Sequence, residues 1–150
     1  MKLDKWDQRF IRVAREVSSW SKDPGTRVGA VLVKDRRIIA TGYNGFPENV
    51  ADTEKRYQDR ETKLSLTVHA EVNALLNAAK NGAQTKGSTL YVTFPPCVHC
   101  STCIIQAGVT KIVCPDPLTA PSRWLKNFLE GQAVMFEADL SRTYFSEDDL

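Results

Sequence analysis

His69-Ala70-Glu71 is followed, 28 residues further along the chain, by Pro96-Cys97-Val98-His99-Cys100. One imidazole and two thiolates with this spacing are typical ligands of a single Zn²⁺ ion. Three protein ligands leave the fourth tetrahedral position open to water, which distinguishes a catalytic zinc from a structural one. Glu71 is not needed as a ligand and is free to transfer protons. The chain must therefore fold so that the two segments meet, and together they predict metal-assisted chemistry.

The spacing within each segment also predicts local structure. Cys97 and Cys100 are expected in the first turn of a helix, where residues three apart share one face and the helix dipole favours thiolates. Residues two apart on a regular helix project about 200° from each other. His69 and Glu71 can therefore face the same ion only if His69 lies at a junction between a loop and a helix. The sequence predicts a site where the N-termini of two helices meet.

The cysteines admit other interpretations. A pair of cysteines alone is compatible with a structural zinc knuckle, and Cys97-x-x-Cys100-x-x-Cys103 resembles part of an iron–sulfur motif. In that motif the fourth cysteine follows after three residues, whereas ten residues separate Cys103 from Cys114. An iron–sulfur cluster would also leave His69 and Glu71 unused. We therefore favour zinc and expect Cys103 to pack in the core.

Composition limits the classes of partner. The net charge of +2 and the pI of about 8.4 provide no strong basic field, so nucleic acid is not an expected partner, whereas a substrate with one phosphate is compatible. The N-terminal residues lack the apolar region of a secretory signal, and no apolar run approaches the ~18 residues of a membrane span. All four cysteines lie within 18 positions, which is metal-site spacing rather than a disulfide framework. We expect one cytoplasmic domain over residues 1–150.

Hydrophobic periodicity predicts alternating helices and strands. The expected helices cover residues 4–20, 70–82 and 121–131, and a further helix carries the cysteines and ends near Gly108. The expected strands cover residues 28–33, 38–42, 89–93, 111–114 and 133–136. A long polar loop is expected from Asn44 to about residue 64, and the acidic residues 146–149 are expected to be mobile or packed on a neighbouring subunit. The pattern predicts an α/β fold with a five-stranded mixed sheet packed between helices.

The motifs resemble those of the cytidine deaminase superfamily, and within it of the deoxycytidylate (dCMP) deaminases. His-x-Glu followed by Pro-Cys-x-x-Cys is the signature of zinc-dependent base deaminases and marks the superfamily. The narrower resemblance extends over residues 19–115 and depends mainly on Ser21-Lys22-Asp23-Pro24 and Gly42-Tyr43-Asn44-Gly45-Phe46-Pro47. The resemblance implies a cytidine deaminase-like fold and hydrolysis of dCMP to dUMP and ammonia.

The resemblance also implies roles for individual residues. Zinc, held by His69, Cys97 and Cys100, activates water for attack on C4 of the cytosine. Glu71 carries protons from that water to N3 and to the departing amine. The backbone N–H of Ala70 binds O2 of the base, and Asn44 holds the sugar or the edge of the base. The expected contacts of the 5′-phosphate are Ser21, Lys22 and Arg27.

Members of this family are typically homohexamers that are activated by dCTP and inhibited by dTTP with Mg²⁺. If the chain shares this control, the expected effector contacts are Gly42, Gly45, Asn77 and Lys80. Lys80 stands where some relatives carry arginine, and lysine lacks the bidentate fork that suits phosphate, so weaker regulation is expected. A second, structural zinc is not expected, because the histidines and cysteines outside the motif are too few.

Three other functions compete with this prediction. A tRNA adenosine deaminase shares the metal motif but is expected to have a more basic surface. A free cytidine deaminase commonly has cysteine at the position of His69 and needs no phosphate contacts. A non-catalytic, zinc-stabilised nucleotide-binding module is expected to lack a proton carrier, yet Glu71 is present. Deamination of dCMP remains the favoured prediction.

Overall fold

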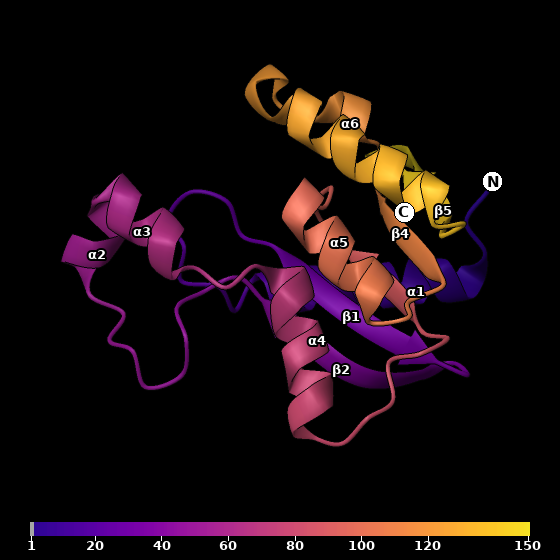
Figure 1. The fold of residues 1–150 in the computed structure, drawn as a ribbon, viewed down its shortest axis with the longest axis horizontal. Coiled ribbons are helices and arrows are strands. Elements are labelled where there is room, and N and C mark those ends of the chain that lie inside the picture. Colours follow the sequence, from indigo (N-terminus) through magenta and orange to yellow (C-terminus); the bar gives the residue numbers. More distant parts are fainter. Residues whose placement is uncertain (1) are drawn as a thin grey trace.

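The structure is a computed structural model that describes residues 2–150 (Figure 1). The strands are β1 (Gly29–Lys34), β2 (Arg37–Tyr43), β3 (Thr89–Val92), β4 (Lys111–Pro115) and β5 (Ser141–Phe145). They form one sheet in the order β2-β1-β3-β4-β5. β1 is antiparallel to β2 and β3, whereas β3, β4 and β5 run parallel to one another. The predicted α/β fold with a five-stranded mixed sheet is confirmed.

Helices cover both faces of this sheet. They are α1 (Lys5–Ser18), α2 (Glu54–Gln58), α3 (Arg60–Leu66), α4 (Ala70–Lys80), α5 (Val98–Gln106) and α6 (Ser122–Glu137). α1 packs on one face, α4 and α5 cover the other, and α6 lies against α5 (Figure 1). α2 and α3 project from the body of the molecule beside the start of α4. Within residues 2–150, none of the helices combines the length and the apolar composition that crossing a bilayer requires.

The alternation of side chains along the strands divides the core into two layers. Val31 and Tyr91 face α1, whereas their neighbours Leu32 and Leu90 face α4 and α5, and all four are buried. Successive side chains of a strand point to opposite faces of a sheet, so a sheet that is covered on both faces buries nearly every position. This explains why β1 reads as a continuous apolar run in the sequence. The sheet thereby provides a rigid base for α4 and α5.

The strand predicted over residues 133–136 is wrong, because these residues form the last turns of α6. A short apolar run does not distinguish a strand from a buried helix segment by its hydrophobicity alone. In α6 the buried residues Phe128, Gln132 and Met135 recur at helical spacing, while Phe136 is exposed. The fifth strand is β5, in which Thr143 and Phe145 are buried and Tyr144 between them is exposed.

The polar loop predicted from Asn44 to about residue 64 is also wrong in part, because α2 and α3 lie within it. The side chain of Thr53 caps α2, and that of Asp59 caps α3. Neither helix buries a residue, so neither produces an apolar periodicity that the sequence analysis could detect.

The acidic residues 146–149 were expected to be mobile or to pack on another subunit, and the structure instead places them on α1 of the same chain. Glu147 forms an ion pair with Arg15 at 2.7 Å. Gln8 donates a hydrogen bond to the carbonyl oxygen of Asp149 at 3.1 Å. Basic and amide side chains on the solvent face of α1 therefore hold this segment.

Candidate active site

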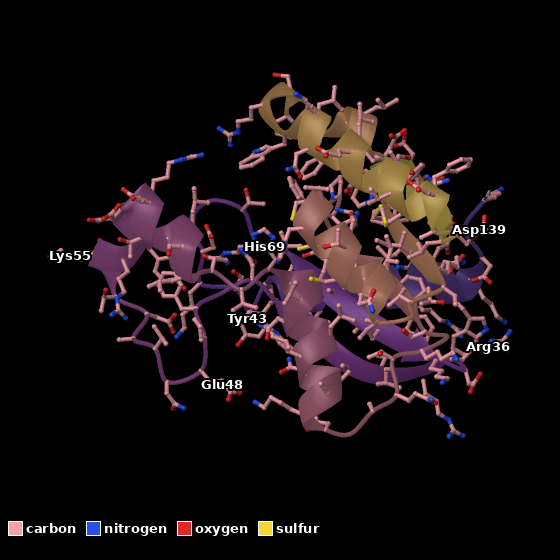
Figure 2. All side chains as sticks on the ribbon, in the orientation of Figure 1. Arg36, Tyr43, Glu48, Lys55, His69 and Asp139 are labelled. Carbon is pink, nitrogen blue, oxygen red and sulfur yellow. The ribbon has the colours of Figure 1, made fainter. Side chains whose placement is uncertain are left out.

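His69, Cys97 and Cys100 come together where α4 and α5 begin. The Nδ1 atom of His69 lies 3.6 Å from Sγ of Cys97 and 3.2 Å from Sγ of Cys100, and all three ligand atoms lie within 4.8 Å of one another. Zinc bonds of ~2.3 Å to sulfur and ~2.0 Å to nitrogen at tetrahedral angles would separate N and S by about 3.5 Å. The donor atoms therefore have the spacing and the chemistry that a single Zn²⁺ ion requires. Figure 2 shows His69 beside the sulfur atoms of α5.

The backbone explains how these side chains converge. His69 is the N-cap of α4 with φ −67° and ψ 151°, and Cys97 is the N-cap of α5 with φ −68° and ψ 166°. Both residues are thus extended and lie just outside regular helix. In a regular helix each residue is rotated by about 100° from the one before, so residues two apart point in nearly opposite directions. Because His69 lies outside the helix, its imidazole and the side chain of Glu71 can face the same site. The predicted meeting of two helix N-termini is confirmed.

Hydrogen bonds around Cys97 favour its thiolate. They lower the pKa of the Cys97 thiol: the Cys100 thiol contributes most, followed by His69 and the backbone N–H of Cys100, and together they outweigh the effect of burial. A thiolate is the form that binds metal. Within residues 2–150, no fourth histidine, cysteine or carboxylate joins the cluster. Cys103 and Cys114 lie outside the cluster, which argues against an iron–sulfur or four-cysteine site and leaves one coordination position for another ligand.

Glu71 lies in the first turn of α4 and is only 4% exposed. Burial raises the pKa of Glu71 to about 7, although its own backbone N–H and the charge on His69 act in the opposite direction. A carboxyl group with this pKa can both accept and release a proton near neutral pH. Glu71 therefore has the position and the acidity of a proton carrier.

A cleft of about 350 Å³ opens onto this cluster. One wall is aromatic: the rings of Phe94 and Phe128 meet edge to face with centroids 5.6 Å apart, and Trp124 stacks on Phe128 at 6.5 Å. The opposite wall includes side chains from α3, among them Lys63 and Leu64. The volume is in the range of small-molecule sites, ~300–1,000 Å³, and an aromatic wall suits a flat ring.

Two predicted substrate contacts, Ala70 and Asn44, line the cleft. Ala70 is in the first turn of α4, whose N–H groups lack partners inside the helix. The polar atoms of the Asn44 side chain are already hydrogen-bonded to the backbone of a neighbouring loop. Its Oδ1 accepts from the N–H of Val28 at 2.8 Å, and its Nδ2 donates to the carbonyl oxygen of Thr26 at 2.9 Å. Asn44 therefore shapes the wall of the cleft through its own loop contacts.

The predicted phosphate contacts Ser21, Lys22 and Arg27 do not themselves line the cleft, although Asp23, Gly25 and Thr26 of the same turn do, and their role stays a prediction. Ser21 is buried, and its hydroxyl donates to the carbonyl oxygen of Asn44 at 2.7 Å. Lys22 forms an ion pair with Asp52 at 2.9 Å, in a separate depression. Arg27 is exposed and donates through Nε to the carbonyl oxygen of Asp23 at 3.3 Å. These three side chains therefore contact the carbonyl oxygens of Asn44 and Asp23 and the carboxylate of Asp52.

Sequence reasoning missed the cations that do line the cleft. Arg60 and Lys63 come from α3, and Arg123 comes from the first turn of α6. Their segments were predicted as a loop and as an ordinary helix, and no motif marked these side chains. Tertiary packing brings these side chains to one cleft from α3 and α6, which Figure 1 shows as separate elements of the fold.

The residues predicted as effector contacts mainly join β2 and the following loop to α4. A Cβ atom on Gly42 would lie 2.3 Å from the backbone nitrogen of Ala74, so β2 and α4 approach too closely for any side chain. Asn77 donates to the carbonyl oxygen of Thr41 at 2.8 Å. The N–H of Gly45 donates to the carbonyl oxygen of Val68 at 3.2 Å. The exposed Lys80 forms an ion pair with Glu48 at 2.9 Å.

Comparisons with known proteins agree with this geometry. A family model described as the cytidine and deoxycytidylate deaminase zinc-binding region matches residues 4–115. An uncharacterized deaminase in the luxG 3′ region of Aliivibrio fischeri is 39% identical over 149 residues, which is 99% of each chain. Human deoxycytidylate deaminase is 36% identical over 115 residues, 73% of this chain and 64% of the relative. The crystal structure of dCMP deaminase from cyanophage S-TIM5 in complex with dCMP and dUMP matches with a TM-score of 0.78 and 27% identity, over 97% of this chain and 100% of that chain.

The chain spans between 56% and 64% of the length of the animal deoxycytidylate deaminases that it matches. The family match nevertheless includes His69, Glu71, Cys97 and Cys100, and it extends from before α1 to the end of β4. Because this match extends over well more than half of the sequence, the chain belongs to the cytidine and deoxycytidylate deaminase family.

Proposed function

We propose that this protein hydrolyses dCMP to dUMP and ammonia. The observation that carries the proposal is the buried carboxyl group of Glu71 beside a three-ligand cluster in a cleft of about 350 Å³. The phage enzyme that matches over the whole of its length was solved with dCMP and dUMP, which favours a nucleoside monophosphate as the substrate.

His69, Cys97 and Cys100 would hold the zinc ion of the family, since their donor atoms are correctly spaced for it. Zinc bound there supplies Lewis acidity, which makes water a competent nucleophile near neutral pH. The two cysteines lie at the start of α5, where the helix dipole supports their negative charge. His69 would bind the ion through Nδ1, the ring atom that lies 3.6 Å and 3.2 Å from the two sulfurs.

Glu71 moves the protons of the reaction in this proposal. Its carboxylate takes one proton from the attacking water and delivers it to N3 of the cytosine, so that the C4–N3 double bond gives way to a C4–O bond. It then takes the second water proton and delivers it to the amine, which leaves C4 as ammonia while the carbonyl of dUMP forms. A pKa of about 7 suits both directions of transfer.

The walls of the cleft orient the pyrimidine ring. Phe94 is followed by Pro95, Pro96 and Cys97, so its ring lies on the wall close to the ligand cluster. Together with Phe128 it offers an apolar surface that excludes water from one face of the base. The first-turn N–H of Ala70 is available to O2 of the base, as the family resemblance implies.

The test compares ammonia release from dCMP, deoxycytidine, dCTP and an RNA that contains adenosine, with loss of the cytosine ultraviolet absorbance as a second readout. We expect dCMP to be the preferred substrate by kcat/KM. Equal efficiency on deoxycytidine would refute the choice of a monophosphate, and turnover of the RNA alone would refute the choice of base.

We further propose that the enzyme assembles as a homohexamer whose activity rises with dCTP and falls with dTTP and Mg²⁺. The family resemblance supports this part, with Gly42, Gly45, Asn77 and Lys80 as the effector contacts; Lys80 would exchange its ion pair with Glu48 for a nucleotide phosphate. Saturation curves for dCMP with and without each effector test the control, and sedimentation analysis tests the assembly. Identical curves in all conditions would exclude the regulation.

A further inference from the structure

The peptide bond between Cys97 and Val98 is held at both of its polar groups. Its N–H group, which belongs to Val98, donates to Oδ1 of Asn127 at 2.9 Å. Its carbonyl group, which belongs to Cys97, accepts from the backbone N–H and from the hydroxyl of Ser101, each at 2.9 Å. The bond from the Ser101 N–H is the first of the regular helix α5, whereas the other two bonds come from side chains. Side chains therefore fix the plane of this peptide beyond what the helix requires.

The orientation of this peptide affects the ligand cluster, because Cys97 is one of its three members. A peptide unit is planar, so its rotation relative to Cys97 is described by one backbone angle, ψ. This angle is 166°, and Cys97 lies outside the regular helix that would otherwise fix it. Rotation about this bond moves Sγ of Cys97 relative to α5, and thus relative to Sγ of Cys100, which α5 carries. The spacing of the two sulfur atoms therefore depends on how firmly this peptide is held.

Asn127 comes from α6, a helix that provides none of the three ligands. Its Oδ1 accepts an N–H at the start of α5, where helical N–H groups have no partner inside the helix. Val98 is half-buried, so loss of this acceptor would leave its N–H without a partner at a cost in free energy. The hydrogen bond thus connects the packing of α6 directly to the backbone of Cys97.

Gly131 lies one turn after Asn127 and on the same face of α6. A Cβ atom on Gly131 would lie 2.6 Å from Oγ of Ser101, which is buried. Glycine therefore leaves room for the hydroxyl that donates to the carbonyl oxygen of Cys97. Figure 1 shows α6 lying against α5. One face of α6 thus acts on both polar groups of the Cys97–Val98 peptide.

We propose that Asn127 is a positioning residue that holds the sulfur of Cys97 in its metal-binding orientation. Ser101 holds the carbonyl group of the same peptide, and Gly131 gives the Ser101 hydroxyl its space. The inference rests on the zinc site of the proposed function, and it does not depend on which base is deaminated. Groups that orient metal ligands through hydrogen bonds change metal affinity by roughly 10- to 100-fold when they are removed.

Zinc affinity, measured without substrate by competition with a chromogenic chelator, tests this proposal. Asn127→Leu keeps the volume of the side chain but offers no acceptor, and it should bind zinc roughly 10- to 100-fold more weakly than wild type. Asn127→Asp keeps an oxygen that accepts the N–H of Val98, and its affinity should stay within about 3-fold of wild type. In the cobalt-substituted protein, the visible absorption from the thiolate ligands should change in Asn127→Leu and be restored in Asn127→Asp.

Thr85→Val is the matched control. The Thr85 hydroxyl donates to the carbonyl oxygen of Ala107 at 2.7 Å, so valine removes one side-chain hydrogen bond from the other end of α5, roughly 15 Å from Cys97. This variant should lower Tm but leave zinc affinity within about 2-fold of wild type, because the two sites share no partner. If Asn127→Leu weakens zinc binding no more than Thr85→Val does, or if Asn127→Asp loses as much affinity as Asn127→Leu, the proposal is wrong.

Gly131→Ala provides a second test that leaves Asn127 in place. The added methyl group would displace the Ser101 hydroxyl, so zinc affinity should fall by roughly 10-fold. In a Ser101→Ala background the hydroxyl is absent, and the same change at Gly131 should weaken zinc binding by less than about 3-fold. Equal losses in the two backgrounds would show that α6 does not act through this peptide and would overturn the proposal.

These measurements separate the inference from the proposed reaction. A wild-type protein that binds zinc, binds it more weakly in Asn127→Leu and releases no ammonia from dCMP would support the inference and refute the reaction. A protein that deaminates dCMP while Asn127→Leu keeps the wild-type zinc affinity would support the reaction and refute the inference.

Discussion

Replacement of Lys63 by methionine is the change that best tests how the cleft is built. Methionine fills a similar volume but leaves the carboxylate of Asp23 buried without its cation. The side chains of Lys63 and Asp23 are 22% and 6% exposed, so the pair lies between the surface and the interior. Removal of one partner from a fully buried ion pair lowers the free energy of unfolding by about 3–5 kcal/mol. An exposed ion pair contributes only about 0–1 kcal/mol to that free energy. We expect Lys63→Met to lower the free energy of unfolding by about 2 kcal/mol.

Thermal unfolding of the zinc-saturated protein measures this effect, and a change of about 2 kcal/mol should lower Tm by about 4–8 °C in a chain of this size. Asp23→Asn is the second half of a double-mutant cycle, because an amide oxygen still accepts the N–H of Gly25 and carries no charge. The double variant should therefore be more stable than Lys63→Met alone, with a coupling of about 1 kcal/mol or more. Because Lys63 joins α3, which lines the cleft, to the buried Asp23, we also expect a raised KM for dCMP in Lys63→Met. Strictly additive losses of stability, or a Lys63→Met protein within about 0.5 kcal/mol of wild type, would refute the reasoning.

Three further predictions concern the site and the helix that carries it. Glu71→Gln should retain zinc by elemental analysis but lose about 10²–10⁴-fold in kcat, because the amide cannot carry protons, and near-normal turnover would remove Glu71 from the mechanism. Cys97→Ala should lose both zinc and thermal stability, since a ligand and the N-cap of α5 disappear together, and a variant with full zinc content would contradict the ligand assignment. Gly42→Ala should lower the free energy of unfolding by about 3 kcal/mol, because the new methyl group would lie 2.3 Å from the backbone nitrogen of Ala74. Gly45→Ala, where nothing lies within 4 Å of the added methyl group, is the control and should change it by less than about 0.5 kcal/mol.

The ligand cluster could be predicted from the sequence because its geometry is local. Cys97 and Cys100 converge through the geometry of the first helical turn, and His69 can join them because it caps its helix in an extended conformation. The same motif places Glu71 two residues after His69, beside the ligands. These relations depend on backbone dihedral angles over a few residues, which short sequence patterns specify.

Most elements were predictable for the same reason, and the errors fall where local patterns are ambiguous. Residues 133–136 are apolar in succession, which fits either a strand or the buried part of α6. α2 and α3 bury no residue, so they lack the periodic apolar face by which a helix is recognised. In both cases packing against the rest of the molecule determines the secondary structure.

The sequence by itself determined which three side chains form the ligand cluster, that the carboxyl group of Glu71 lies beside them, and the class of fold that supports them. Only the tertiary structure decided which charged side chains line the cleft. Arg60 and Arg123 are 63 positions apart and line one cleft through α3 and α6, whereas Lys22 lies in the signature segment yet pairs with Asp52 in a separate depression. Ligand convergence depends on dihedral angles within a turn, but the lining of a cleft depends on how distant elements pack, and no short pattern contains that information.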